Sequence, residues 1–343
     1  MRILALDLGT TSTKTHGYLL DTRTGHVTRP AITTSVGAFL DLLRNTAPDL
    51  VVAEPTPITG VLVDTCRAQE IPVKILNVRD PAWQNRTNKT DRNDAELMAN
   101  LVVTGHFRTV DIPSRDIREW RAPIAHRHNL VRERTRIKNR IKSTLNGELI
   151  PAKSLWSKRG LKFLHELTLS PERSASWRAI LSIDLERYHQ VQAHVTTATQ
   201  LLDDRLLTHP HAEAILALPG VGPRLAESLL AHLVTAQRFH DRKAVAAYVG
   251  ICPRVQQSGK FSHYGRITKA GNTQLRTLLI EVAQLGARRP GWMRDIYIKN
   301  QRGDKSRSNR AITAVARRLL VRCWAILRDR EKAPEPTPAT VAA

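Results

Sequence analysis

The sequence predicts a mixed α/β domain followed by mostly helical domains, and three observations carry this prediction. Short apolar runs such as Ile3–Leu6 and Leu50–Ala53 have the length and composition of buried strands. From Arg115 onward the apolar residues recur at helical spacing instead. The charge also changes along the chain: the first 100 residues hold as many basic as acidic side chains, so the net charge of +22 lies entirely after them.

The N-terminal elements follow one another in a recognisable order. Besides the two runs above, strands are predicted over Thr15–Leu20, His26–Thr33 and Val73–Leu76, and helices over Gly60–Gln69 and Asp91–Val103. The order is three strands, helix, strand, helix, strand, helix. This order is typical of a ribonuclease-H-like (RuvC-like) domain.

Long helices are predicted for the rest of the chain. Arg115–Leu149 and residues 176–207 form two of them, which we expect to pair as an antiparallel, coiled-coil-like linker. Ala212–Leu279 is predicted to be a compact helical unit, and Ala311–Leu327 an amphipathic helix. The predicted domains are therefore 1–112 (RuvC-like), 113–207 (helical linker), 208–330 (mostly helical C-terminal domain) and 331–343 (a disordered tail rich in Pro, Ala and Thr).

The composition indicates a polyanionic partner and argues against a membrane protein. Residues 115–160 carry a net charge of +9 and residues 254–310 a net charge of +10, as expected of surfaces that bind nucleic-acid phosphates. No apolar run approaches the roughly 18 residues of a membrane span, and we expect no signal peptide. Three distant cysteines predict neither a disulfide framework nor a Cys-based zinc site, so a cytoplasmic location is expected.

Four carboxylates could converge in this order of elements. Asp7 and Glu54 end two predicted strands, and Asp91 and Asp94 share one face of a predicted helix. Such a cluster suits one or two Mg²⁺ ions, or Mn²⁺ in their place, which organise phosphoryl transfer. Taken singly, Asp91 is also explained as an N-cap, Asp94 as a first-turn residue and Glu54 as a loop residue. Taken together, the four favour a metal site.

A Gly/Thr-rich segment supports a competing interpretation. Asp7–Lys14 resembles the first phosphate loop of actin-like ATPases and sugar kinases, since such a turn can offer backbone amides to phosphate. Those folds need a second half with its own Asp-x-Gly turn, and no later Asp-x-Gly occurs in this sequence. An actin-like sugar kinase is therefore an alternative and not the preferred interpretation.

Several segments of the helical part are candidates for nucleic-acid binding. Leu216–Ala226 has the form of a helix-hairpin-helix turn, whose Gly220 and Gly222 would let backbone amides approach a phosphate; a plain helical turn is equally consistent. Candidate phosphate contacts on the first long helix are Arg132, Arg134, Arg136, Lys138, Arg140 and Lys142. A glycine-rich stretch adds Lys260, Arg266, Lys269 and Arg276. In that stretch Ser258 stands beside Gly259-Lys260, a setting for a nucleophile near phosphate, although composition alone favours a surface-loop serine.

Taken together and in order, these motifs resemble the DEDD transposases of the insertion-sequence "one-ten" family, the bridge-RNA-guided serine recombinases. The resemblance covers about residues 1–330. It is carried by Asp7, Glu54-Pro55, Lys89–Ala95 and the Arg132–Asn146 helix, and then by Leu218–Gly222, Tyr248–Gly250, Gln257–Lys260 and Lys269–Arg276.

The resemblance implies a mechanism that composition and spacing do not show. Asp7, Glu54, Asp91 and Asp94 would hold Mg²⁺ at the scissile phosphate of double-stranded donor and target DNA. Ser258 would attack that phosphate and form a phosphoserine–DNA intermediate, although Ser262 lies close enough to be an alternative nucleophile. The family also implies a structured noncoding RNA, a homo-oligomer (dimer or tetramer) and a bacterial, nucleoid-associated location. A RuvC-like hydrolytic nuclease and a non-catalytic nucleic-acid-binding protein remain as alternatives.

Overall fold

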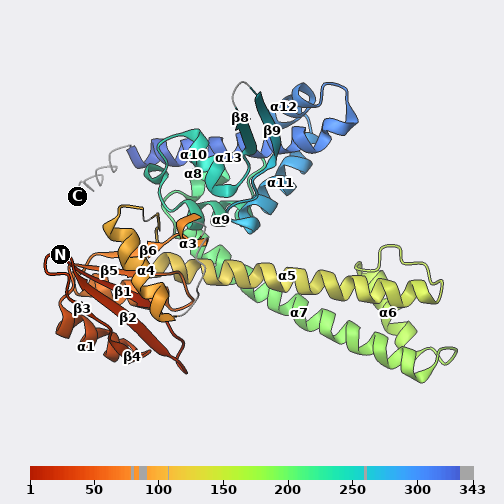
Figure 1. Cartoon of the computed structure of the whole chain (residues 1–343). Helices are drawn as coiled ribbons and strands as arrows, with labels where there is room; N and C mark the ends of the chain where they lie inside the picture. Colours follow the sequence, from red (N-terminus) through yellow and green to blue (C-terminus); the bar gives the residue numbers. More distant parts are fainter. Residues whose placement is uncertain (79–80, 85–90, 107, 259–260, 333–343) are drawn as a thin grey trace, which may run out of the picture. The chain divides into compact units, whose positions relative to one another are not determined.

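The computed structural model divides into two compact units, residues 1–118 and residues 119–343 (Figure 1). It describes residues 1–78, 81–84, 91–106, 108–258 and 261–332, and only the backbone at 81–82, 91–92, 255–258 and 261–264. As predicted, the first unit is mixed α/β and the second is mostly helical. No described helix has both the length and the apolar character needed to cross a membrane.

One sheet organises the first unit. Its described strands are β1 (Arg2–Asp7), β2 (Lys14–Asp21), β3 (Val27–Thr28), β4 (Ala31–Thr33), β5 (Leu50–Ala53), β6 (Val73–Leu76) and β7 (Thr109–Val110). They lie in the order β3-β2-β1-β5-β6-β7, with β4 paired to β2. β1, β5 and β6 are parallel, whereas β2 runs antiparallel to β1. The strand predicted over His26–Thr33 is split into β3 and β4, because Pro30 between them has no amide to donate to a ladder.

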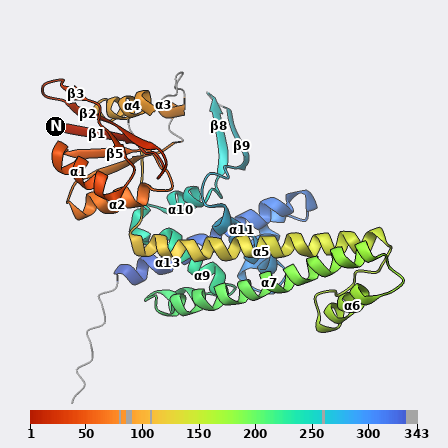
Figure 2. The same cartoon turned by 90° about the horizontal axis from the view of Figure 1, so that it is seen from below.

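Helices cover both faces of this sheet. They are α1 (Val36–Thr46), α2 (Thr59–Ala68), α3 (Pro81–Gln84) and α4 (Asp91–Val103). Figure 2 shows α1 and α2 on one side of the strands and α3 and α4 on the other. The core follows the same division, since Leu4 and Leu6 of β1 pack with α1 and α2, whereas Ile3 and Ala5 pack with α4. This alternation is what a strand buried on both faces requires.

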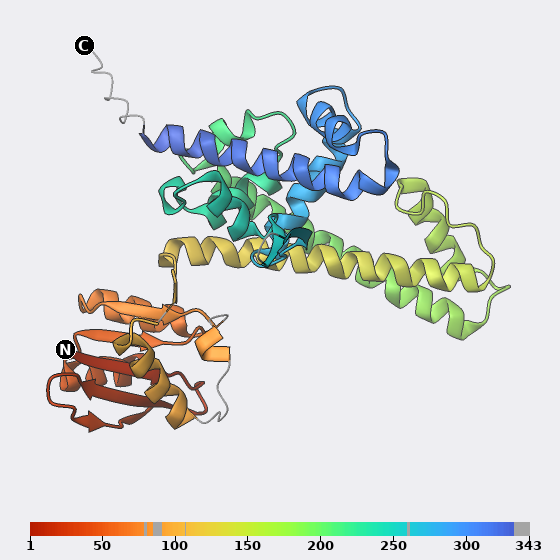
Figure 3. The same cartoon turned by 45° about the horizontal axis from the view of Figure 1, so that its top comes forward.

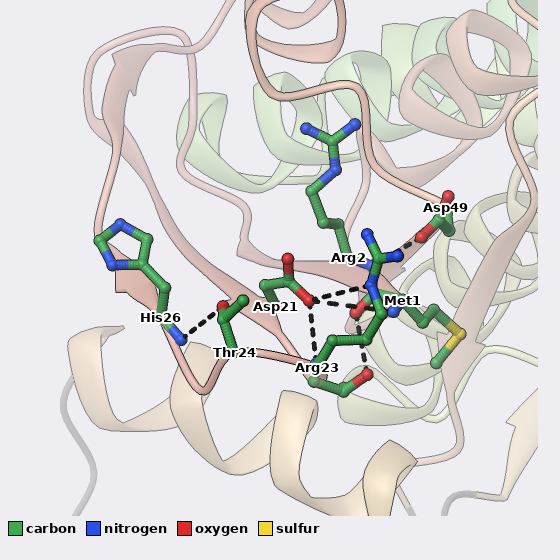
Figure 4. A network of polar contacts seen from close by, with 8 residues as sticks. Met1, Arg2, Asp21, Arg23, Thr24, His26 and Asp49 are labelled. Carbon is green, nitrogen blue, oxygen red and sulfur yellow. Dashed lines mark hydrogen bonds and ion pairs between the residues drawn. The ribbon is translucent and has the colours of Figure 1, made fainter.

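Polar contacts hold the start of β1 in place (Figure 4). The Arg2 amide donates to Asp49 Oδ2 at 2.7 Å, and the N-terminal ammonium lies 3.9 Å from Asp21 Oδ1. The Arg23 amide also donates to Asp21 Oδ1, at 2.9 Å. These bonds tie β1 to the end of β2 and to the residues before β5, so they fix the edge of the sheet where β1 begins.

Two long helices dominate the start of the second unit. They are α5 (Arg115–Gly147) and α7 (Ala175–Leu207), and α6 (Lys158–Leu169) lies in the connection between them. The two long helices run side by side in Figures 1 and 2. Ile137, Ile141 and Leu145 of α5 share a buried core with Leu181 and Leu185 of α7. The predicted antiparallel pair is therefore present, whereas α6 was not predicted.

The remaining elements form a helical group with one hairpin. They are α8 (Ala212–Leu216), α9 (Pro223–Leu233), α10 (Arg242–Val249), α11 (Thr273–Ala287), α12 (Trp292–Gln301), α13 (Ser308–Lys332) and the strands β8 (Pro253–Ser258) and β9 (Phe261–Ile267). The long helix α13 extends across this group (Figure 3) and contacts α8, α10, α11 and α12. The hairpin β8–β9 projects from it (Figure 2). The sequence was interpreted as helical here, so the hairpin corrects that prediction. The predicted tail, 331–343, starts two residues too early, because Glu331 and Lys332 belong to α13; residues 333–343 lie outside the described residues.

Candidate active site and nucleic-acid interface

Asp7 and Glu54 stand at the carboxyl ends of neighbouring parallel strands. The register pairs Leu6 of β1 with Ala53 of β5; Asp7 ends β1, and Glu54 follows β5 directly. Both carboxylate side chains are half-buried. The strand order thus brings two of the four predicted carboxylates to one edge of the sheet.

The same two residues also share a face of the sheet. Successive side chains of a strand point to opposite faces. Leu6 and Leu8 pack with α1 and α2, so Asp7 between them belongs to the face that α4 covers. Val52, two residues before Glu54, packs on that face as well. Alternation therefore directs both carboxylates toward the layer between the sheet and α4.

Helix α4 supplies a third carboxylate to this layer. Asp94 lies in the first turn of α4 and is only 9% exposed. Met98, one turn later, is fully buried against the sheet, and residues four apart share a face of a helix. Asp94 is therefore on the side of α4 that packs on the sheet. The side chain of Asp91, the first residue of α4, lies outside the described residues.

The donor atoms of these residues fit a hard divalent cation. Mg²⁺ prefers carboxylate oxygens, and it commonly keeps waters and substrate phosphate oxygens beside one or two carboxylates. Among the side chains that the structure describes, no three His, Cys, Asp or Glu lie close enough together to hold a metal ion. Asp7, Glu54 and Asp94 therefore do not form a closed cage. An ion held by some of them would be completed by Asp91, water or substrate oxygens.

The Gly/Thr loop after β1 uses its own amides. The Gly9 amide donates to Thr15 Oγ1 at 3.2 Å, and the Thr10 amide donates to Thr13 Oγ1 at 2.6 Å. The Thr13 amide donates to the Thr10 carbonyl at 3.1 Å, and the Ser12 amide to Thr10 Oγ1 at 3.4 Å. A phosphate loop instead presents its amides to the ligand. The geometry therefore does not favour the sugar-kinase interpretation.

Ser258 is the last residue of β8. The ladder pairs Ser258 with Phe261, and Gln257 with Ser262, so the two candidate serines occupy adjacent rungs of one hairpin. Gly259 and Lys260, between the strands, lie outside the described residues, as do the side chains of both serines. The backbone thus puts Ser258 at the end of a projecting hairpin, where β8 meets the connection to β9.

The six candidate cations of α5 divide into two sets of three. Arg134, Lys138 and Arg140 contact α7, and Lys138 also contacts Trp156, which precedes α6. Arg134 Nη1 donates to Gln192 Oε1 at 2.8 Å, and the Arg140 guanidinium forms a two-pronged ion pair with Asp184 at 2.5 and 3.0 Å. Lys138 Nζ lies 4.7 Å from the centre of the Trp156 ring, and burial lowers the pKa of this lysine. These three side chains already hold the helical pair together.

The other three cations face solvent. Arg132, Arg136 and Lys142 are exposed, and no ion pair joins any of them to another described residue. At 100° per residue Arg132 lies opposite the buried stripe of Ile137 and Ile141. We refer to Arg132, Arg136 and Lys142 as the exposed trio. They are the members of the predicted run that are available to phosphates.

The predicted helix-hairpin-helix turn connects α8 to α9. Gly220 has φ +90°, and the Val221 amide donates to the Leu218 carbonyl at 3.0 Å, which closes a turn that requires glycine at this position. Gly222 is the N-cap of α9 and is exposed. The turn therefore has the predicted form, and the helix start that follows it presents backbone amides.

The glycine-rich stretch contributes cations of two kinds. Arg266 and Lys269 are exposed. Arg276 is buried: Nη1 donates to the Val249 carbonyl at 2.8 Å, and Nη2 donates to Thr273 Oγ1 at 3.1 Å. Burial also lowers the pKa of Arg276. Its guanidinium fastens α11 to the end of α10, so we do not retain it as a phosphate contact, and Lys260 lies outside the described residues.

Comparison with known proteins places this chain in a family. Residues 212–298 match the model of the "Transposase IS116/IS110/IS902 family", and residues 10–150 match a model described as "Transposase", of the DEDD type of IS110. The chain belongs to the IS110 transposase family. The family resemblance seen in the sequence is thereby confirmed.

Individual relatives agree with the two family models. The chain is 27% identical to the 44.8 kDa protein of insertion element IS116 from Streptomyces clavuligerus, over 79% of this chain and 78% of the relative. It is 27% identical to the transposase for insertion sequence element IS1111A from Coxiella burnetii, over 76% and 72%. It is 24% identical to the transposase for IS1328 from Yersinia enterocolitica, over 70% and 72%.

Membership in the IS110 family makes this chain an insertion-sequence transposase, an enzyme that cuts and rejoins DNA. DEDD transposases work with a divalent metal ion. Glu54, Asp91 and Asp94 fall within the matched residues 10–150, and Ser258 falls within the matched residues 212–298. Asp7 lies three residues before the start of the match at residue 10.

One ionisable residue of this transposase was missed by the sequence interpretation. Glu227 on α9 is only 2% exposed, and burial raises its pKa to about 7. Its Oε2 lies 3.1 Å from Arg224 Nη1, and Arg224 also pairs with Asp203 on α7. Arg127 of α5 is a further neighbouring charge. The sequence feature that could have revealed Glu227 is its position as an acid within the apolar stretch of α9, most of whose residues are buried.

Proposed function

We propose that this transposase cuts and rejoins DNA through a serine nucleophile, Ser258, and a metal site made of Asp7, Glu54, Asp91 and Asp94. Mg²⁺ is the proposed ion, with Mn²⁺ as a substitute. The observation that carries the proposal is that Asp7 and Glu54 stand at the carboxyl ends of neighbouring parallel strands, where strand alternation directs both toward the face that α4 covers.

The strand arrangement supports a ribonuclease-H-like, RuvC-like fold for the first unit. Three antiparallel strands, β3-β2-β1, continue into β5 and β6, which run parallel to β1. Helices lie on both faces of this sheet (Figure 2). Because the carboxyl ends of the parallel strands meet at one edge, carboxylates at these ends are available to a single ion.

The carboxylates are proposed to bind and orient the reacting phosphate. A divalent cation held by them supplies positive charge that stabilises phosphate oxygens during displacement. Asp94, buried on the side of α4 that packs on the sheet, is restricted to few rotamers, and the strand ends restrict Asp7 and Glu54. A fixed set of oxygen ligands therefore orients the phosphate without reorganisation during the reaction.

The serine step conserves the phosphodiester bond. Ser258 Oγ attacks phosphorus, the bond from phosphorus to the leaving sugar oxygen breaks, and the hydroxyl proton passes through solvent to that oxygen. The new bond is a phosphoserine linkage. A sugar hydroxyl of another strand then attacks the same phosphorus, which breaks the serine ester and restores the Ser258 hydroxyl. Strands are exchanged without net hydrolysis.

The partners proposed for this transposase are nucleic acids and further copies of itself. Double-stranded donor and target DNA are the proposed substrates, and a structured noncoding bridge RNA is the proposed guide. The exposed trio, Arg266 and Lys269 support such binding, because exposed cations attract phosphates of either nucleic acid. A dimer or tetramer working at the bacterial nucleoid completes the proposal.

The experiment that tests the mechanism is denaturing electrophoresis of labelled DNA after incubation with protein, RNA and Mg²⁺. Wild type is expected to form a protein–DNA adduct, and Ser258→Ala is expected to lose both adduct and recombinant product. Ser262→Ala, on the adjacent rung of the hairpin, is the matched control and should keep both.

The other outcomes separate the alternatives. An adduct lost only in Ser262→Ala would move the nucleophile to Ser262. Free cleaved ends without adduct in any lane would indicate a hydrolytic RuvC-like nuclease. Binding without cleavage by any protein would indicate a non-catalytic nucleic-acid-binding protein.

A further inference from the structure

The second unit contains a cavity of about 300 Å³ beside the turn that precedes α9. Three segments form it: the turn itself, the end of α11 and the start of α12. Its described lining includes Gly220, Val282, Leu285, Arg289, Trp292 and Met293. No described residue of the hairpin β8–β9 lines the cavity, and the proposed mechanism does not use it.

Two glycines allow the floor of this cavity to form. Met293 is 5% exposed and packs against Gly220 and Gly286. A Cβ at Gly286 would lie 2.1 Å from Met293 Sδ, and one at Gly220 would lie 2.7 Å from Met293 Cε. Both distances are too short for non-bonded atoms. The backbone therefore approaches the methionine closely on two sides and leaves a smooth apolar floor.

The walls of the cavity are apolar and partly open to solvent. Leu285 is 56% exposed, although it is a large aliphatic side chain. Trp292 is half-buried, and the Arg322 guanidinium carbon lies 3.8 Å from the centre of its ring. A cation stacked on one face of the indole holds the ring in position. The cavity thus offers an oriented aromatic ring and an aliphatic wall to a ligand from solution.

The charge around the cavity is positive. Arg289 is the only charged residue among the described lining, and no acid accompanies it there. Gly291, the N-cap of α12, also lines the cavity, and Gly222, the N-cap of α9, lies two residues after the lining residue Gly220. Neither helix start has a side-chain cap, so both leave backbone amides uncapped, although Pro223 contributes no amide to α9 and Asp295 in the first turn of α12 offsets part of the positive charge there. This combination suits a ligand with a flat apolar part and adjacent negative charge.

We propose that this cavity holds one unstacked nucleobase of a DNA strand, with the flanking phosphates at Arg289 and the start of α12. Bases stack on aromatic side chains irrespective of sequence, and a base taken out of the stack can be held in a protein pocket between aromatic or apolar side chains. The inference rests on the proposed function only in taking a DNA strand as the ligand. It adds a base-binding site that the carboxylates and the serine do not require.

The test combines a filled cavity with a strand that lacks one base. Leu285→Trp should fill the cavity; Ile298→Trp on α12 is the matched control, because Ile298 is 53% exposed and does not line the cavity. Single-stranded DNA with one abasic position, moved along the strand, is titrated against each protein by fluorescence anisotropy. When the abasic position reaches the cavity, wild type and Ile298→Trp should bind the abasic strand about 5- to 150-fold more weakly than the intact strand. Leu285→Trp should bind the abasic and the intact strand with equal affinity.

A fluorescent base gives an independent readout. With 2-aminopurine at the position found above, wild type should quench its emission by stacking, and Leu285→Trp should not. Abasic strands bound by wild type as tightly as intact strands at every position would overturn the proposal. An equal loss of affinity on base removal in Leu285→Trp and Ile298→Trp would also overturn it. So would a loss of affinity that occurs with abasic RNA of the same sequence but not with abasic DNA, or a Leu285→Trp variant that changes its oligomeric state and keeps its DNA affinity.

The base-binding proposal and the serine mechanism can fail separately. Ser258→Ala should retain the abasic effect while it loses the covalent adduct. An adduct that persists in Ser258→Ala would overturn the serine mechanism and leave the cavity proposal standing. Equal affinities of Leu285→Trp and wild type for every intact strand would overturn the cavity proposal and leave the mechanism standing.

Discussion

The two units of this transposase differ in the use of their charged residues. Acids and bases balance over the first 100 residues, and Asp7 and Glu54 share one edge of the sheet there. The whole net charge of +22 lies in the rest of the chain, which is mostly helical. In the proposed mechanism the first unit holds a phosphate through carboxylates, which by themselves repel it. Cations elsewhere in the chain supply the attraction that offsets this repulsion.

Within the second unit, some cations make internal contacts and others face solvent. On α5 the side chains of Arg134, Lys138 and Arg140 make contacts within the helical pair, whereas the exposed trio faces solvent. Charge count alone therefore overstates the number of phosphate contacts. Substitutions can break each of these divisions separately.

The largest effect is expected from removing a carboxylate. Asp94→Asn should lower DNA strand transfer by about 1000-fold or more, because the stabilisation of a phosphate by a metal site amounts to several kcal/mol. DNA affinity should stay within about threefold, since the amide has the same size and the cations remain. Strand-transfer assays and anisotropy check this, with Asp41→Asn on α1, an exposed acid, as the control. Wild-type rates in Asp94→Asn would exclude the carboxylate site.

The next effect concerns Glu227 and depends on pH. Burial raises the pKa of Glu227 from 4.5 to about 7, so the folded state holds this proton more tightly than the unfolded state. The contribution to stability is complete below about pH 4.5 and is lost as pH rises toward 7, by up to about 3 kcal/mol. Glu227→Gln should remove that slope, so the wild type minus variant difference in unfolding free energy should fall from about pH 5 to about pH 7.5. The unfolding free energies are measured by denaturant titration at each pH. A difference between wild type and Glu227→Gln that stays constant from about pH 5 to about pH 7.5 would contradict this prediction.

A smaller effect is expected from the contacts that hold α5 to α7. Asp184→Ala should lower the free energy of unfolding by about 1–3 kcal/mol, because Asp184 is 9% exposed and accepts two bonds from Arg140. Glu133→Ala breaks a more exposed pair with Arg187 at 3.4 Å and should cost less than about 1 kcal/mol. Thermal and urea unfolding measure both. Equal losses would show that burial of the acid does not set the strength of these pairs.

The smallest effect is expected from the exposed trio, since one surface cation changes the affinity for nucleic acid only a few-fold at physiological salt. Replacing Arg132, Arg136 and Lys142 by Gln should flatten the slope of log affinity against log salt by about 0.7–0.9 for each phosphate that is no longer neutralised. The control replaces Lys153, Lys158 and Arg159, three exposed cations at the far end of the helical pair. If both triple variants change the slope equally, the trio acts only through net charge.

Much of the fold could be predicted because local patterns specify it. Leu50–Ala53, Val73–Leu76 and Asp91–Val103 were predicted with the bounds that the structure has, since buried strands and amphipathic helices follow from residues close in sequence. The hairpin β8–β9 was missed, because its weak alternation gains stability only from pairing across the turn. Helix α6 was missed in a segment whose apolar residues pack on α5 and α7.

The sequence by itself determined the family, the α/β-then-helical order and the positions of carboxylates at strand ends. Tertiary structure alone decided which of these residues share a face, because the β1–β5 register and the packing of α4 join segments about 50 to 90 residues apart. It also separated cations that pair internally from cations that face solvent, and it buried Glu227 and Arg276. Charge and spacing are properties of the chain, whereas burial and pairing depend on which distant residues the fold brings together.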